Sequence, residues 1–72
     1  MDKIKLGIYK HYKGNEYRVL GIALHSETLE EMVIYQALYG EYKIWVRPKS
    51  MWNELVEVNG NKIPRFMFLR EE

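Results

Sequence analysis

The sequence has no cysteine among its 72 residues. A disulfide framework and a cysteine-ligated zinc site are therefore excluded, although small domains often need one of them to support a small core. Lack of cysteine also fits the reducing cytoplasm, which is the location that we expect. Stability must come from dense apolar packing or from self-association, and the sequence leaves the oligomeric state open.

Long hydrophobic runs are missing as well. The longest apolar run covers residues 20–24 and contains a glycine, whereas a membrane-spanning helix needs about 20 apolar residues. The N-terminal residues also lack the apolar stretch of a signal peptide. We therefore expect no membrane segment and a single soluble domain over residues 1–72.

The sequence has no large excess of positive or negative charge. Eleven Lys and Arg residues stand against ten Asp and Glu residues, which gives a net charge of +1 and no global field for nonspecific binding to nucleic acids. Basic groups are in excess over residues 1–26, and acidic groups are in excess over residues 27–57. Complementary hairpins within one fold explain this difference, and a nucleic-acid-binding face is the alternative.

Signatures of common enzymes are absent too, including glycine-rich phosphate loops, dinucleotide-binding fingerprints and His-Glu-x-x-His zinc motifs. Only His11, His25 and Glu27 form a group suited to acid-base or metal chemistry, because imidazole titrates near neutrality. The strand order that we expect keeps the two histidines far apart. We therefore predict hydrogen-bonded structural histidines, no catalytic residue, no metal ion and no cofactor.

The residues that are present indicate β-structure. Short runs rich in Val, Ile, Tyr and Trp alternate with turn residues every 8–12 positions, as in small barrels. We predict an all-β fold, a small SH3-like barrel of five to six antiparallel strands with one short helical or 3₁₀ turn at residues 49–53. The expected strands cover residues 7–12, 17–25, 32–39, 42–47, 54–58 and 61–69. A capping-box pattern at residues 28–31 keeps a helix open for residues 29–38.

Two turns predict hairpin registers. Gly14 and Asn15 both tolerate positive φ, so we expect a two-residue turn that pairs Tyr12 with Tyr17. The dipeptide at residues 59–60, Asn-Gly, predicts a type I′ turn that pairs residue 57 with 62 and residue 56 with 63. Strict alternation beyond this turn would point residue 65 inward, so we expect a bulge or bend at residue 64 or 65.

Aromatic residues are abundant, with six Tyr, two Trp and two Phe. Packing accounts for many of them, but peptide-binding barrels use aromatic grooves, and single-stranded nucleic acids stack on aromatics among basic groups. Alternation along residues 42–47 separates Trp45 and Arg47 from Ile44 and Val46, and we expect the latter pair to be buried. The first strand places Tyr9 and His11 on one face. The candidate binding residues are therefore Tyr9, His11, Trp45 and Arg47.

Several separated strings carry a resemblance to a known family. They are GIYKHYKGNEY at residues 7–17, HSET at 25–28, VIY at 33–35, LYG at 38–40, WVRP at 45–48 and PRF at 64–66. Together they resemble small, mostly bacterial proteins catalogued as domain of unknown function 1653. The resemblance covers nearly the whole chain and implies a short bacterial β domain, but it supplies no substrate and no functional residues. The family pattern often shows glycine after Ser-Glu-Thr, where this chain has Leu29.

These observations favour a non-enzymatic binding module that uses an aromatic and basic surface. A protein or peptide is the favoured partner, although the sequence names none. The alternatives are a small enzyme or enzyme subunit with a His/Glu/Arg site built from His11, His25, Glu27 or Arg47, and a protein that binds RNA or single-stranded DNA.

Overall fold

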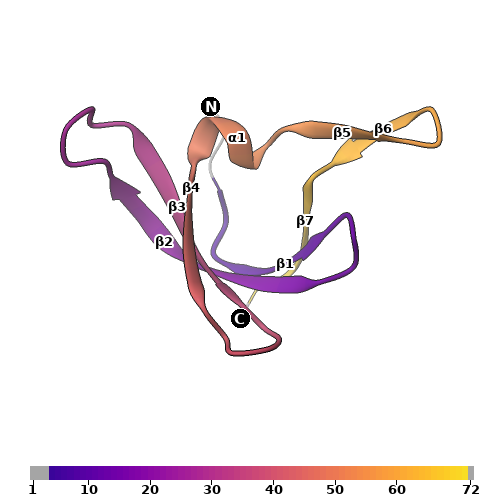
Figure 1. The fold of residues 1–72 in the computed structure, drawn as a ribbon, viewed down its shortest axis with the longest axis horizontal. Coiled ribbons are helices and arrows are strands. Elements are labelled where there is room, and N and C mark those ends of the chain that lie inside the picture. Colours follow the sequence, from indigo (N-terminus) through magenta and orange to yellow (C-terminus); the bar gives the residue numbers. More distant parts are fainter. Residues whose placement is uncertain (1–3, 72) are drawn as a thin grey trace.

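The computed structural model describes residues 4–71, which form seven strands and one short helix (Figure 1). The strands are β1 (Gly7–His11), β2 (Glu16–Leu24), β3 (Glu31–Ala37), β4 (Ile44–Pro48), β5 (Leu55–Val58), β6 (Asn61–Pro64) and β7 (Phe66–Arg70), and the helix is α1 (Lys49–Trp52). Five strands form an antiparallel sheet in the order β4-β3-β2-β1-β7, and β5 pairs with β6 in a separate hairpin. The predicted all-β class is confirmed.

Most of the predicted elements are present at their expected places. The helical turn occupies residues 49–52, directly after Pro48. Residues 31–37 form a strand in which Val33, Tyr35 and Ala37 alternate inward and are buried, so the helical alternative for this segment is wrong. The last predicted strand is divided into β6 and β7 by a bend at Arg65, as alternation required.

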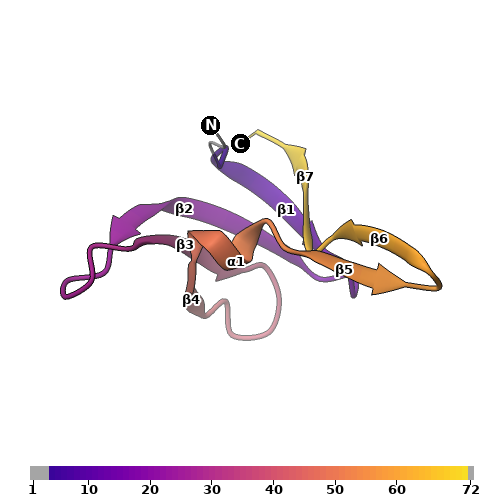
Figure 2. The same cartoon turned by 90° about the horizontal axis from the view of Figure 1, so that it is seen from above.

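The predicted closed barrel is not formed. Strands β4 and β7 are the two edges of the five-stranded sheet, and no ladder among residues 4–71 joins them. Register shifts at residues 8–9 and 19–21 interrupt the ladders, and such bulges bend a sheet. The β5–β6 hairpin, which could have extended the sheet, pairs with itself and projects away from it (Figures 1 and 2). The architecture is a curved, open sheet with an attached hairpin.

The first hairpin differs from its predicted register. Tyr9, and not Tyr12, is the partner of Tyr17. The loop is longer than expected because the His11 amide donates to the Asn15 carbonyl at 2.7 Å, and the Gly14 amide donates to the His11 carbonyl at 2.7 Å. Within this loop only Gly14 has a positive φ, at 109°, which is typical of a three-residue loop and not of a two-residue turn.

The β5–β6 turn has the predicted geometry. Asn59 and Gly60 have φ angles of 52° and 83°, as a type I′ turn requires. Glu57 pairs with Lys62, so opposite charges meet across the ladder. At the base of the hairpin the Arg65 amide donates to the Glu54 carbonyl at 2.9 Å, which fixes the start of the bend that leads into β7.

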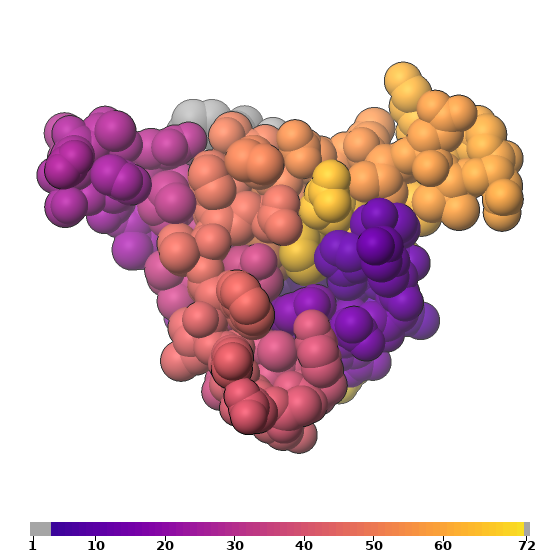
Figure 3. All heavy atoms as spheres, in the orientation of Figure 1, coloured from indigo at the N-terminus to yellow at the C-terminus, as the bar shows by residue number. Residues whose placement is uncertain are grey.

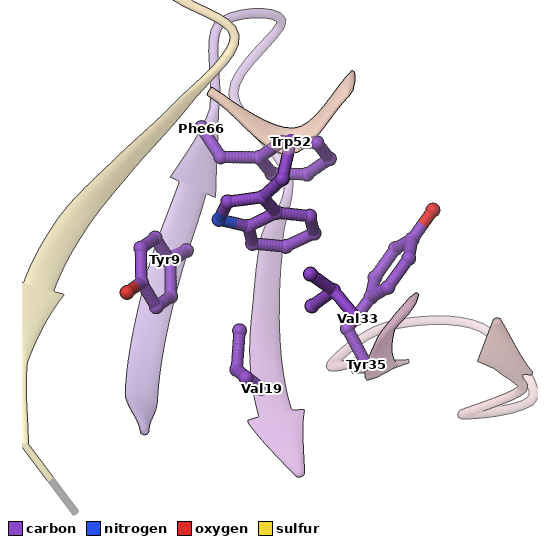
Figure 4. Close-up of a cluster of buried hydrophobic side chains, with 6 residues drawn as sticks. All are labelled: Tyr9, Val19, Val33, Tyr35, Trp52 and Phe66. Atoms are coloured by element: carbon purple, nitrogen blue, oxygen red, sulfur yellow. The ribbon is translucent and has the colours of Figure 1, made fainter. Parts of the chain in front are cut away.

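The core lies on the concave face of the sheet, beneath α1. Figure 4 shows Trp52 stacked on Phe66 above side chains of β1, β2 and β3. Trp52 is 1% exposed, although its helix has only four residues and no side-chain cap at its N-terminus. Packing of the indole ring, rather than helix propensity, therefore holds α1 in place. The core cluster comprises Tyr9, Val19, Val33, Tyr35, Trp52 and Phe66.

Candidate binding surface

The face assignment predicted for the fourth strand is inverted. Ile44 and Val46 are 61% and 55% exposed, so the prediction that they are buried is wrong. Trp45 pairs with Tyr35 and Arg47 pairs with Val33 in the β3–β4 ladder. Paired residues share a face of the sheet, so Trp45 and Arg47 belong to the concave face that carries the core. The reason is that α1 covers the concave side, whereas the outer side of β4 has no covering layer among the described residues.

Arg47 lies at the edge of the core and has no ionic partner among the described residues. Its guanidinium carbon is 5.7 Å from the centroid of the Phe66 ring, a distance typical of a cation–π contact. Its Nε atom is buried and has no hydrogen-bond partner, and no acidic residue of the described chain forms an ion pair with it. The positive charge of Arg47 is therefore not neutralised within residues 4–71.

His11 contacts the same phenylalanine from the end of β1. The centroid of its ring is 5.0 Å from that of Phe66 and 4.6 Å from that of Tyr12. The His11 Nδ1 atom accepts a hydrogen bond from the Lys13 amide at 3.2 Å, which helps to stabilise the three-residue loop. Phe66 thus connects His11 and Arg47, which are 36 positions apart in the sequence.

Nearby charges act on the His11 imidazole. Partial burial lowers the pKa of His11 below its usual value of 6.5, and the cations of Arg65, Lys13 and Arg47 lower it further. Each of these effects disfavours the imidazolium form. The surroundings of His11 are therefore electropositive.

Two tyrosines extend this surface along β2 and the β3–β4 turn. The hydroxyl oxygens of Tyr17 and Tyr39 are 2.6 Å apart and share a hydrogen bond. Burial and this hydrogen bond raise the pKa of Tyr17 to about 12, so the Tyr17 hydroxyl stays protonated at neutral pH. In Figure 3 the loop of the first hairpin, in purple, lies beside the β3–β4 turn, in pink and red.

A small pocket lies next to Tyr39. Its volume is about 110 Å³, below the usual range for drug-sized ligands, and Trp45 forms one wall while remaining 51% exposed. The pocket residues are Ala37, Tyr39, Gly40, Glu41, Lys43 and Trp45. A pocket of this size and lining suits one side chain of a partner better than a whole metabolite.

Tyr9 does not belong to this surface. Its side chain is 6% exposed, and its hydroxyl donates to the Lys5 carbonyl at 2.7 Å. Its ring lies edge-on to Trp52 and Phe68 at centroid distances of 5.4 and 5.3 Å. Tyr9 shares a face with His11, as alternation predicts, but it lies deeper on that face, where Trp52 covers it. The structure therefore joins His11, Trp45 and Arg47 and leaves Tyr9 in the core.

His25 lies in the β2–β3 turn. Its Nδ1 atom accepts hydrogen bonds from the amides of Glu27 and Thr28 at 3.2 and 3.3 Å. Both imidazoles thus accept backbone hydrogen bonds in turns, as expected for the hydrogen-bonded histidines that the sequence predicted. Among residues 4–71, no hydrogen bond or ion pair joins a carboxylate to either imidazole, and no group of three residues is arranged to hold a metal ion.

Comparison with known proteins agrees with the resemblance seen in the sequence. The model of the family described as "Protein of unknown function (DUF1653)" matches residues 7–68. The chain belongs to this family. A crystal structure of a DUF1653 protein from Bordetella bronchiseptica matches with a TM-score of 0.88 and 35% sequence identity, covering 97% of this chain and 92% of that one. The search of curated proteins found no match. No helix among the described residues has the length and apolarity needed to cross a membrane.

The strings that resemble DUF1653 meet at this surface, although they are separated in the sequence. The string at residues 7–17 contributes His11 and Tyr17, and the string at residues 45–48 contributes Trp45 and Arg47. The string at residues 64–66 contributes Arg65 and Phe66, neither of which was a candidate from the sequence. The sequence feature that could have identified Phe66 is the bend expected at residue 64 or 65. Such a bend reverses the inward and outward alternation of side chains along the strand, so it turns the Phe66 ring toward the core.

Proposed function

We propose that this DUF1653 chain is a non-enzymatic binding module that contacts a protein or peptide through the surface formed by His11, Tyr17, Trp45 and Arg47. The observation that carries this proposal is the state of Arg47, a cation that lies over the Phe66 ring and forms no ion pair in the described chain. Aromatic and arginine side chains are enriched at interface hot spots because they combine large contact areas with directional donors.

The form of the surface supports a peptide as the partner. SH3-like modules bind extended peptides in shallow grooves lined by aromatic side chains, and we extend this mode of recognition to the present open sheet. Tyr39 and Trp45 flank a pocket large enough for one side chain, and Arg47 follows Trp45 on the same face of β4. An extended segment that lies along β4 would meet all three residues.

The chemistry of the histidines gives less support to an enzyme. Both Nδ1 atoms accept backbone hydrogen bonds, and the described residues supply neither imidazole with a carboxylate partner. A general base works best with an orienting group and a pKa near the operating pH, whereas burial and the cations around His11 lower its pKa below the usual value of 6.5.

Nucleic acid is the second candidate, and one observation favours it. Lys13 Nζ and Arg65 Cζ lie 5.8 and 6.0 Å from the centroid of the Tyr12 ring, so an aromatic ring is flanked by two cations. Single-stranded nucleic acids bind to such combinations of stacking platforms and basic groups. Binding of this type should weaken steeply between about 50 and 200 mM salt, whereas a peptide complex should change little.

The test is an affinity capture from bacterial lysate, with and without nuclease, followed by binding measurements with the captured partner. Trp45→Ala and Arg47→Ala should each weaken binding at least tenfold, the usual loss at a hot spot. Leu55→Ala is the matched control, because Leu55 is equally exposed but lies on the β5–β6 hairpin. Amide shift changes confined to the β5–β6 hairpin, residues 55–64, would place the contact elsewhere and refute the proposal.

A further inference from the structure

Three cations from different segments surround His11. Lys13 comes from the first hairpin loop, Arg47 from β4, and Arg65 from the bend before β7. Lys13 and Arg65 lie against the Tyr12 ring, and Arg47 lies against the Phe66 ring. The His11 ring contacts both of these rings. We call His11, Lys13, Arg47 and Arg65 the His11 cluster.

The positive charge of this cluster is only partly compensated within the described chain. Arg65 Nη2 lies 3.4 Å from Glu54 Oε1, and this is the one ion pair that the cluster forms among residues 4–71. The Nε atoms of Arg47 and Arg65 are buried and find no hydrogen-bond partner in the part of the chain that the structure describes. Buried donors without partners are unfavourable, so a ligand that accepts hydrogen bonds and brings negative charge would be stabilised here.

The neighbouring cations do not continue this positive charge along the sheet. Lys43 Nζ is 3.3 Å from Glu41 Oε1, and Lys49 Nζ is 3.2 Å from Glu31 Oε1, so the cations at both ends of β4 are already paired. Arg70, at the end of β7, lies 3.8 Å from Glu16. A nucleic acid needs a row of phosphate contacts, whereas this arrangement offers one concentrated site.

We infer that the His11 cluster binds a single carboxylate of an acidic segment in the partner peptide. This inference rests on the proposed function, since it names the ligand chemistry of the same surface. A guanidinium presents a planar set of donors that matches a carboxylate, and Arg47 forms no ion pair with any acidic residue between positions 4 and 71.

Binding of an anion should be linked to protonation of His11. Because Nδ1 accepts the Lys13 amide proton, the neutral ring carries its own proton on Nε2, where it can donate to a carboxylate. The charged groups that face His11 are the cations Lys13, Arg47 and Arg65, and the nearby Tyr17 stays neutral because its pKa is raised to about 12. A bound anion offsets these cations, so it should raise the pKa of His11. Affinity should therefore increase as the pH falls through that pKa.

The experiment measures the pKa of both histidines by NMR of the imidazole Cε1 protons. Wild-type protein is titrated at constant ionic strength with a short blocked peptide that contains glutamates and a tyrosine. If the protonated form binds about tenfold more tightly, saturation raises the pKa of His11 by about one unit. His25 is the internal control, because its Nδ1 atom makes the same type of backbone contact outside the cluster. Its pKa should not change.

Two comparisons make the result specific. The same peptide with glutamine in place of glutamate should leave the pKa of His11 unchanged. Arg47→Gln should abolish the response, and Lys62→Gln, which removes a charge that faces Glu57 on the separate β5–β6 hairpin, should retain it. If Arg47→Gln fails to fold, Lys13→Gln is the alternative variant, because it removes another cation of the cluster at an exposed loop position. It should reduce the response of His11.

Three outcomes would overturn the inference. An equal change in the pKa of His11 with the glutamine peptide would show that the cluster does not recognise a carboxylate. A larger, strongly salt-dependent response to oligothymidylate would assign the cluster to nucleic-acid phosphates instead. No response of His11 to any probe, together with amide shifts at Trp45 on addition of the captured partner, would refute the carboxylate site while the proposed binding surface stands.

Discussion

Trp52 and Phe66 stack face to face, with ring centroids 3.9 Å apart and an angle of 2° between the ring planes. This contact joins α1 to the start of β7. The β5–β6 hairpin lies between these two segments in the sequence, so the stack closes the base of the hairpin. The same Phe66 ring contacts His11 and lies beside Arg47. One aromatic stack therefore links the core to the candidate binding surface.

Removal of this stack should destabilise the whole fold. Trp52→Ala creates a cavity under α1 and should cost about 3–5 kcal/mol, a large share of the stability of so small a protein. Chemical denaturation followed by circular dichroism measures the loss. Trp45→Ala is the control, since that ring is half exposed and its removal should cost about 1 kcal/mol or less. Equal losses for the two variants would contradict the assignment of Trp52 to the core.

Gly7 should not tolerate a side chain. Its φ is 146°, and an added Cβ would collide with the Arg70 carbonyl oxygen across the β1–β7 ladder. Gly7→Ala should therefore lower the free energy of unfolding by about 2 kcal/mol or more, through backbone strain and separation of the two strands.

Gly21→Ala is the matched control for this variant. Gly21 also lies in a strand, but no atom is within 4 Å of an added Cβ, and its backbone needs no glycine. Alanine at this position should leave stability unchanged or raise it by about 0.5 kcal/mol, because it restricts the unfolded chain. A Gly21→Ala loss as large as that of Gly7→Ala would show that close strand approach is not the cause.

Leu29 should be improved by glycine. Its φ is 63°, in the left-handed region that costs a non-glycine residue about 1–2 kcal/mol, and its side chain is 68% exposed. Glycine removes that strain but loses about 0.5–1 kcal/mol to chain entropy, so Leu29→Gly should gain about 0.5 kcal/mol. Leu24→Gly, at an equally exposed position within β2, should instead be destabilising. A higher melting temperature for Leu29→Gly checks the prediction.

Stability should depend on pH through His11. The folded-state pKa of His11 is lowered, so the unfolded chain binds a proton more readily than the native protein does. The contribution of neutral His11 is complete above pH 6.5, and it is lost as the pH falls through 6.5 toward the lower pKa of the folded state. His11→Gln should remove this part of the pH dependence of the melting temperature, and His25→Gln should preserve it. Identical pH profiles for wild type and His11→Gln would contradict this role.

The sequence predicted local features well where a single residue type decides the conformation. Asn59-Gly60 determined a type I′ turn, and Pro48 separated β4 from a helical turn. The bend before Phe66 was predicted because strict alternation continued from the β5–β6 hairpin would have pointed the charged residue 65 inward. The unusual residue at position 29, where the family pattern often shows glycine, lies in a left-handed conformation.

Features that depend on tertiary packing could not be predicted in the same way. The alternation of side chains along β4 places Trp45 and Val46 on opposite faces of the strand. It does not indicate which of these two faces α1 covers. The exposed outer pair, Ile44 and Val46, is the more apolar one, so hydrophobicity alone favoured the wrong face. The first hairpin was shifted because His11 stabilises a longer loop through its own side chain. Closure of a barrel depends on which edges meet, and local sequence carries little information on that.

The position of Pro48 bears on how this open sheet avoids aggregation. The Ala37 amide donates a hydrogen bond to the Lys43 carbonyl, so the backbone groups of residue 43 face β3. Backbone groups in an antiparallel ladder alternate in direction, and those of residues 44, 46 and 48 therefore face away from β3, toward the free edge of the sheet. Proline at the third of these positions removes a donor that a foreign strand would need, and Lys43 and Lys49 bracket the edge with charge. The strand whose apolar side chains face solvent is thus a poor template for growth of a fibril.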